Sequence, residues 1–232
     1  DGLADPAGYL ARLRDAGVRH AWVEKILAVG EHLRDWPVEG TVGYEFLVDV
    51  AALFVDPRGE APLTELWHEL SGDDRPFEAW ADEAQLEIAT GTFARELQRL
   101  RDLLDDDGMA AALGELPVYR TYVEPWSGLV TDEDREAIAA IGSERLRRVL
   151  TLEETGPTHH EFVTRFQQTS PPVTAKGVED TAFYRYGRLL ALNEVGGEPA
   201  RFGMSVADFH RANEERARRF PHNLLVTSTH DT

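Results

Sequence analysis

Glu24 is a side chain whose type and setting could serve acid–base chemistry. It lies between Ala21-Trp22-Val23 and Ile26-Leu27, an apolar setting that predicts partial burial of its carboxyl group. Burial raises the pKa of a carboxyl group, and a carboxyl group with a raised pKa suits a general acid. The same spacing fits a structural glutamate paired with Lys25 or with an arginine, and both interpretations stay open.

A second candidate is the pair His230-Asp231, which follows the apolar stretch Leu224–Ser228. An imidazole and a carboxylate at the carboxyl end of a strand could face one ligand. An ordinary turn after a strand has the same composition, so the pair alone is a weak signal.

A third candidate is the polar stretch Lys176–Thr181, which predicts a loop with one cation, one glycine and two acids, followed by the aromatic residues Phe183, Tyr184 and Tyr186. Aromatic rings beside polar groups suit a sugar, because the apolar faces of the sugar stack on the rings and its hydroxyls find hydrogen-bond partners. A helix start that packs its aromatic side chains into the core fits the stretch equally well.

Lysine is rare in this chain, since Lys25 and Lys176 are the only lysines among 24 basic residues. A compact ammonium group fits where a planar guanidinium does not. Both lysines fall in the stretches above, which favours a role for them, although chance explains them as well.

The elements that would position these groups begin with a helix over 6–16, ended by Gly17, and a strand over 20–27. Glu24 then lies near the carboxyl end of the strand, ahead of a loop over 30–43. In α/β barrels this is the end of the strand where catalytic groups lie.

The middle of the chain changes pattern. Residues 45–116 have apolar positions at helical spacing and predict a helical insertion packed as a layer of its own. Pro117 ends it, and Val118–Val123 alternates like a second strand. Thr131 and the acids after it predict a capped helix that runs to about Leu150.

Glu161–Gln168 predicts a short helix that ends before the break at Pro171-Pro172. Ser205 caps a helix over 206–219, Pro221 stops it, and Leu224–Ser228 forms the third strand. The predicted segments are therefore 1–44 with the first strand, 45–116 as the helical insertion, and 117–232 with a further helical excursion and the last strand.

Composition limits the function. The 232 residues are 42% apolar, enough for a core, and the net charge of −18 repels nucleic-acid backbones. No apolar run reaches the length of a membrane span, and the absence of cysteine favours the cytoplasm. His159-His160 is the one adjacent histidine pair, and because neighbouring residues diverge on a helix it predicts a poor chelate, so no metal site is expected.

Several stretches together resemble the maltooligosyl trehalose synthases, which belong to the α-amylase superfamily. The matching stretches, in chain order, are Trp22–Leu27, Pro117–Val123, Ala175–Tyr186, Leu192–Gly197 and Ser228–Thr232. The match over Ala175–Tyr186 is the most specific, and the His-Asp pair is the least. Enzymes of this family are much longer, so the chain would be their middle portion.

The resemblance implies part of a (β/α)₈ TIM barrel, about strands five to seven, in the α/β class. It implies that Glu24 is the general acid and base, that Asp231 stabilises the transition state, and that His230 binds the sugar. Lys176, Phe183, Tyr184, Tyr186 and Asp1 are the further substrate-binding residues. The nucleophilic aspartate is expected just before Asp1, so the chain by itself should be inactive.

The implied reaction moves the reducing-end α-1,4 linkage of a maltooligosaccharide to an α,α-1,1 linkage, with no cofactor. The product has a trehalose end, and the functional partner would be maltooligosyl trehalose trehalohydrolase. Two alternatives remain: a glucan hydrolase of the same superfamily, and an acidic helical protein-interaction module without catalytic activity.

Overall fold

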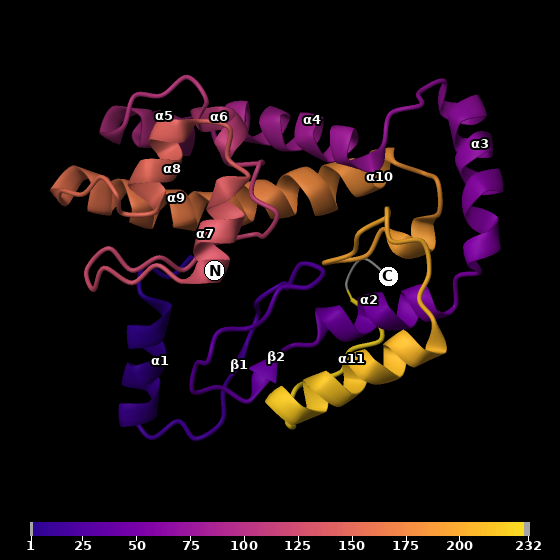
Figure 1. Cartoon of the computed structure of the whole chain (residues 1–232), viewed down its shortest axis with the longest axis horizontal. Coiled ribbons are helices and arrows are strands. Elements are labelled where there is room, and N and C mark those ends of the chain that lie inside the picture. The colour runs from indigo at the N-terminus through magenta and orange to yellow at the C-terminus, as the bar shows by residue number, and fades with distance from the viewer. Residues whose placement is uncertain (1, 230–232) are drawn as a thin grey trace. The chain divides into compact units, whose positions relative to one another are not determined.

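The computed structural model describes residues 2–229 and consists mainly of helices, with one small parallel sheet (Figure 1). The described residues form two compact units, one made of 2–6 and 81–182 and the other of 7–80 and 183–229. The first is called here the helical unit and the second the sheet unit. No helix in the described part of the chain is both long and apolar enough to span a membrane.

The sheet unit begins with α1 (Pro6–Asp15), which ends at Gly17 with φ 92°, as the sequence predicts. The sheet consists of β1 (Trp22–Val23) and β2 (Gly40–Thr41), which run parallel with Trp22 opposite Gly40. The first predicted strand is therefore present but only two residues long, and β2 lies inside a stretch predicted to be a loop.

The prediction of a third strand over Leu224–Ser228 is wrong, because this segment has no strand ladder of its own. It nevertheless runs beside β2, since Leu224 N donates to Thr41 O at 3.3 Å and Asn223 Oδ1 accepts from Thr41 N at 2.6 Å. Gly43 lies directly against the backbone of Leu224 and Val226, so the segment follows β2 in the same direction.

Helices α2 (Tyr44–Leu53) and α11 (Val206–Arg219) pack together in the sheet unit (Figure 1). Ser205 caps α11 by accepting from Asp208 N, which confirms the predicted start of this helix. Arg216 Nη2 of α11 lies 2.7 Å from Asp49 Oδ2 of α2, so the two helices share an ion pair that is largely buried. The other elements of this unit are the short helix η1 (Pro57–Gly59), α3 (Glu60–Ser71), α10 (Phe183–Arg185) and η3 (Leu190–Leu192).

The helical unit contains α4 (Phe77–Thr90) from Ala81 onward, α5 (Ala94–Leu103), α6 (Met109–Ala112), α7 (Asp132–Ala139), α8 (Glu144–Leu150) and α9 (Pro157–Thr174). Their apolar faces meet in one core that includes Leu100, Met109, Ile138, Leu146 and Phe162, all fully buried. The prediction that residues 45–116 are mainly helical is confirmed, but the prediction that they pack as a layer of their own is wrong, because α2 packs on α11 in the sheet unit. The structure divides these helices between the two units, and the three-segment division stays a prediction.

The second predicted strand, Val118–Val123, is not a strand, and the reason is local. Its backbone bonds to side chains instead of to another strand: Val123 N donates to Gln167 Oε1 at 2.7 Å, and Val123 O accepts from Gln167 Nε2 at 3.0 Å. Asp134 accepts from Tyr122 N at 2.8 Å. The alternating pattern reflects an extended segment held in place by α7 and α9.

Two helix predictions also need correction. The helix predicted from Thr131 to about Leu150 is two helices, α7 and α8, because Gly142 and Ser143 interrupt it and Ser143 caps the second. The Thr131 cap itself is confirmed, including its reciprocal bond with Asp134.

The short helix predicted over Glu161–Gln168 is the middle of α9, which continues through Pro171 and Pro172. A proline inside a helix removes a backbone hydrogen bond and usually kinks it. Here the packing of α9 outweighs that cost, since Ser170 and Val173 are fully buried and Ser170 Oγ donates to Tyr119 O at 2.9 Å.

Candidate active site

The carboxyl ends of the parallel strands lie at one edge of the small sheet, and chemically capable residues follow each of them. Glu24 comes directly after β1, and Tyr44 begins α2 shortly after β2. The segment over 223–226 runs beside β2 in the same direction and leads to Thr229. Parallel strands therefore bring Glu24, Tyr44 and Thr229 toward the same edge.

Glu24 is exposed, so the partial burial predicted from its apolar neighbours is wrong. Its Oε1 accepts a hydrogen bond from the hydroxyl of Tyr44 at 3.0 Å. The predicted structural alternative, a pair with Lys25 or with an arginine, is not what the structure has, because Lys25 pairs with Glu31 and the partner of Glu24 is Tyr44. Glu24 is thus oriented by a neutral hydroxyl group on the neighbouring strand end and keeps its carboxyl group open to solvent.

Lys25 occupies the buried position that the sequence pattern suggests for Glu24, with only 2% of its surface exposed. Its Nζ donates to Ile26 O at 2.6 Å and to Glu31 Oε2 at 2.9 Å, and the same carboxylate oxygen accepts from Ala28 N at 2.9 Å. A buried charge needs such a set of partners. Lys25 therefore organises the loop after Glu24.

The segment Leu192–Gly197 lies against this loop. Gly196 has φ 74°, and a Cβ at this position would lie 2.9 Å from Ile26 Cγ2, so both its conformation and its close contact favour glycine. The neighbouring Glu194 accepts from Thr229 Oγ1 at 2.9 Å and from Val195 N at 3.1 Å, both through Oε1. The segment thus contacts the loop that follows Glu24 and also holds the chain just before His230.

His230, Asp231 and Asp1 lie outside the described residues, so their predicted roles stay predictions. The structure brings the described residue Thr229 into the same unit as Glu24, and Leu192–Gly197 contacts both Thr229 and Ile26, two residues after Glu24. The sequence interpretation missed Tyr44, Glu194 and Gly196. The consecutive glycines of Asn193-Glu194-Val195-Gly196-Gly197 were the available signal for the last two.

The sequence predicted a loop over Lys176–Thr181, and this prediction is wrong. The stretch is part of a π-helix, η2 (Ala175–Ala182), in the helical unit. Gly177 explains the tight packing, since a Cβ here would lie 2.7 Å from Gln85 Cα. Glu179 is buried and accepts from the Tyr119 hydroxyl at 2.6 Å. Lys176 forms an ion pair with Asp180, and 57% of its side chain is exposed.

The aromatic residues after Lys176 divide into two kinds. Phe183 and Tyr186 are buried in the sheet unit, where they form an aromatic cluster with Trp67, Phe77 and Trp80. Burial raises the pKa of the Tyr186 hydroxyl. Tyr184 is 73% exposed, so it is the member of this set whose ring is open to a ligand.

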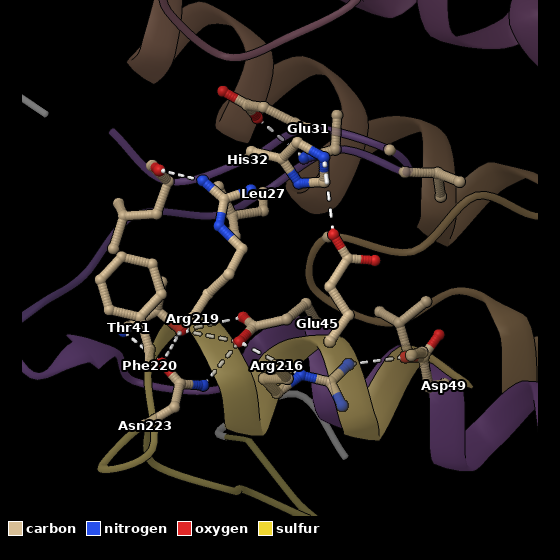
Figure 2. Close-up of a pocket in the computed structure, with 18 of the residues that line it drawn as sticks. Leu27, Glu31, His32, Thr41, Glu45, Asp49, Arg216, Arg219, Phe220 and Asn223 are labelled. Carbon is tan, nitrogen blue, oxygen red and sulfur yellow. Dashed lines mark hydrogen bonds and ion pairs between the residues drawn. The ribbon is translucent and has the colours of Figure 1, made fainter. Parts of the chain in front are cut away.

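A charged hollow of about 480 Å³ lies between the loop over 27–33, α2 and α11 (Figure 2). Its polar wall groups bond to one another: Glu45 Oε1 accepts from Thr41 Oγ1 and from Asn223 Nδ2, both at 2.8 Å, and Arg216 pairs with Asp49. None of the described residues predicted to act on substrate lines this hollow. Its internal pairing makes it a feature of helix packing, and the sheet edge is the better candidate site.

Within residues 2–229 no cluster of three or more histidine, aspartate or glutamate side chains is arranged to hold a metal ion. His159 and His160 both lie on α9, and His159 Nδ1 is buried without a hydrogen-bond partner.

Comparison with known proteins gives the context for this edge. No protein-family model matches the chain. Two curated Mycobacterium tuberculosis proteins, from strains H37Rv and CDC 1551, are provisionally named maltooligosyl trehalose synthase and are 38% identical over 251 residues, which covers 100% of this chain and 32% of each relative. The chain therefore spans about a third of the length of the curated relatives that it matches.

Solved structures agree with the sequence comparison. The maltooligosyltrehalose synthase of Arthrobacter ramosus has a TM-score of 0.86 and 35% identity, over 99% of this chain and 31% of that one. A hypothetical maltooligosyl trehalose synthase of Sulfolobus tokodaii has a TM-score of 0.82 and 31% identity, again over 99% of this chain and 31% of its own. The resemblance indicated by the sequence motifs is confirmed: the whole chain matches about one third of these enzymes.

Proposed function

Because the chain is similar along its whole length to maltooligosyl trehalose synthases, we propose that it forms part of a (1→4)-α-D-glucan 1-α-D-glucosylmutase. The substrate is a maltooligosaccharide, and the product carries an α,α-1,1-linked trehalose unit at its former reducing end. The scaffold is a (β/α)₈ barrel to which β1, β2 and the segment after Asn223 contribute. The protein acts in the cytoplasm, and a maltooligosyl trehalose trehalohydrolase consumes its product.

The observation that carries this proposal is the shared edge of Glu24 and Thr229. Glu24 follows β1 and has its carboxyl group exposed, while Thr229 is bonded to Glu194, two residues before the Gly196 that packs on Ile26. A retaining transfer needs one carboxyl group for proton transfer and another to form the glycosyl ester, both beside one glycosidic bond. Glu24 supplies the first, and Asp231, close after Thr229, supplies the charge that stabilises the transition state.

The reaction proceeds in two steps. An aspartate in the segment before Asp-Gly-Leu attacks C1 of the penultimate glucose, the C1–O4 bond breaks, and Glu24 donates its proton to the leaving oxygen. The released glucose stays bound and turns. Its C1 hydroxyl then attacks the ester carbon, Glu24 accepts the proton, and the carboxylate leaves. No bond to water forms.

His230 and Asp1 bind the sugar at the bond that reacts, and Lys176 with the nearby aromatic residues Phe183, Tyr184 and Tyr186 holds the released glucose while it turns. Tyr184 is the best supported of the aromatic set, because its ring is exposed. Phe183 and Tyr186 are buried in the aromatic cluster with Trp67, Phe77 and Trp80, so their part in binding is to support the neighbouring backbone.

The test uses the protein at the full length of its relatives, with maltopentaose as the substrate. The expected result is loss of reducing ends with little free glucose, and abolition of this reaction by Glu24→Gln while substrate binding is kept. The amide preserves the shape of Glu24 but donates no acidic proton. An increase in reducing ends would identify a glucan hydrolase, and absence of any glucan binding would favour an interaction module.

A further inference from the structure

Trp126 stands at the rim of a second hollow, in the helical unit. This hollow has a volume of about 320 Å³ and is lined by Pro125, Trp126, His160, Glu161, Thr164, Arg165 and Gln168. Trp126 is 52% exposed, although tryptophan side chains are highly buried on average. None of the residues so far assigned to the reaction lines this hollow.

Trp126 is part of a well-bonded turn. Glu124 N donates to Leu129 O at 3.0 Å, Gly128 N donates to Glu124 O at 2.9 Å, and Ser127 Oγ donates to Glu124 Oε2 at 2.7 Å. Gly128 adopts φ 76°, which allows the turn to close. Trp126 therefore sits on a fixed support.

The opposite wall is α9, and its distance from the turn is also fixed. Gln167 of α9 is 1% exposed and bonds to both backbone groups of Val123, just before the turn. The backbone that leads into the turn is thus tied to α9 in the absence of a ligand. A preformed site loses less entropy on binding.

The side chains on this face of α9 are polar, but their charges cancel. His160, Thr164 and Gln168 recur at a spacing of four residues and so form one stripe. Beside them Glu161 Oε1 accepts from Arg165 Nε at 2.8 Å, which neutralises both charges. A hollow with an open indole face, several hydrogen-bonding groups and no net charge suits a neutral polyhydroxylated ligand better than a charged one.

We propose that Trp126 and the His160–Gln168 face of α9 form a binding site for glucose units of an α-1,4-glucan chain. This inference rests on the proposed function for the choice of glucan. The C–H face of a glucose ring stacks on the indole of Trp126, and its hydroxyl groups bond to His160 and to Oε1 of Gln168, whose Nε2 already donates to Gly2 O at 2.7 Å. The site adds affinity for long chains and leaves the conversion of the shortest substrates unchanged.

The experiment measures retardation of the full-length protein in native gels that contain soluble starch, beside kcat and KM for maltotriose. Trp126→Ala should reduce the affinity for starch roughly tenfold, the loss of one stacked ring, with maltotriose kinetics unchanged. His160→Ala should give a smaller loss, and Trp126→Phe should keep part of the affinity. Phe54→Ala, which removes an aromatic side chain that is 84% exposed, is the matched control and should behave like the parent protein.

Starch retardation of Trp126→Ala equal to that of the parent protein would overturn the site. An equal loss of maltotriose turnover would overturn it too, because the residue would then serve the reacting sugars themselves. If Trp126→Ala does not fold, His160→Ala decides by the same two measurements. A parent protein that binds starch through Trp126 but makes no trehalose-ended product would contradict the proposed function and leave this site standing.

Discussion

The hydroxyl group of Tyr44, the first residue of α2, lies 3.0 Å from Oε1 of Glu24, the residue that follows β1. A residue that follows β2 thus orients the carboxyl group of the residue that follows β1. A carboxylate held by one directed hydrogen bond has fewer orientations to search before proton transfer.

Tyr44→Phe should therefore lower kcat of the full-length enzyme about fivefold, with KM within about twofold of the parent value, because the hydroxyl orients the acid and does not hold the sugar. The measurement is initial-rate kinetics on maltopentaose. Tyr9→Phe, on α1, removes another partly exposed hydroxyl and is the control. A rise in KM at unchanged kcat would instead show that Tyr44 binds substrate.

The bond between Thr229 and Glu194 gives the second prediction. Thr229→Val removes the donor but keeps the shape, and it should lower kcat about tenfold because the segment before His230 loses its anchor. Thr229→Ser should restore the rate. In a double-mutant cycle Glu194→Ala should add little to Thr229→Val, and Glu198→Gln, an exposed acid in the same region, should have no effect. Fully additive losses would contradict the anchor.

Lys176→Arg should shift the products from mutase toward hydrolysis. Lys176 pairs with Asp180 on η2, and a guanidinium group would keep that pair but fill more space and bind in one plane. If the released glucose is held less well it escapes more often, and water completes the reaction. The measurement is the ratio of free glucose to trehalose-ended product from maltopentaose, with Arg99→Lys on α5 as the control. An unchanged ratio would make Lys176 a surface ion-pair residue.

Gln167→Leu should destabilise the helical unit by about 2–4 kcal/mol, because Val123 N–H and C=O would both stay buried without partners. The expected result is faster hydrogen exchange of the backbone amides over 118–123 and in α9. Gln98→Leu removes an exposed amide group on α5 and should change the free energy of opening derived from hydrogen exchange by less than about 0.5 kcal/mol. Equal exchange in the two variants would mean that solvent already satisfies Val123.

Helix starts could be predicted from the sequence because their signals are local. Thr131 and Ser205 cap helices with their own side chains, within a few residues of sequence. The length of a helix also depends on packing against residues far away in sequence. For this reason α9 continues through Pro171, although a proline locally favours a helix end.

The strands could not be predicted as well, because an extended segment becomes a strand only when another backbone pairs with it. Val118–Val123 has the right alternation, but Gln167 and Asp134 take its hydrogen bonds. Gly40–Thr41 has no pattern at all and becomes β2 through its pairing with Trp22–Val23.

The site was predicted in part. Glu24 was identified as a candidate, but its burial was wrong because Lys25, with Glu31 as its partner, takes the interior position. Tyr44 and Glu194 were missed because each acts through a residue far away in sequence, and nothing in their own neighbourhood points to that partner.

The π-helical geometry of η2 also affects how this stretch tolerates insertions and deletions. In a π-helix residues five apart, not four, are stacked, and Thr181 Oγ1 accordingly donates to Lys176 O at 2.8 Å. Removing one residue between Lys176 and Glu179 would shift each later residue of the stretch by one position, which is about 100° around the helix axis. Glu179 would then lose Tyr119, so the length of Ala175–Ala182 is as constrained as its composition, although its polar sequence looks like that of a freely variable loop.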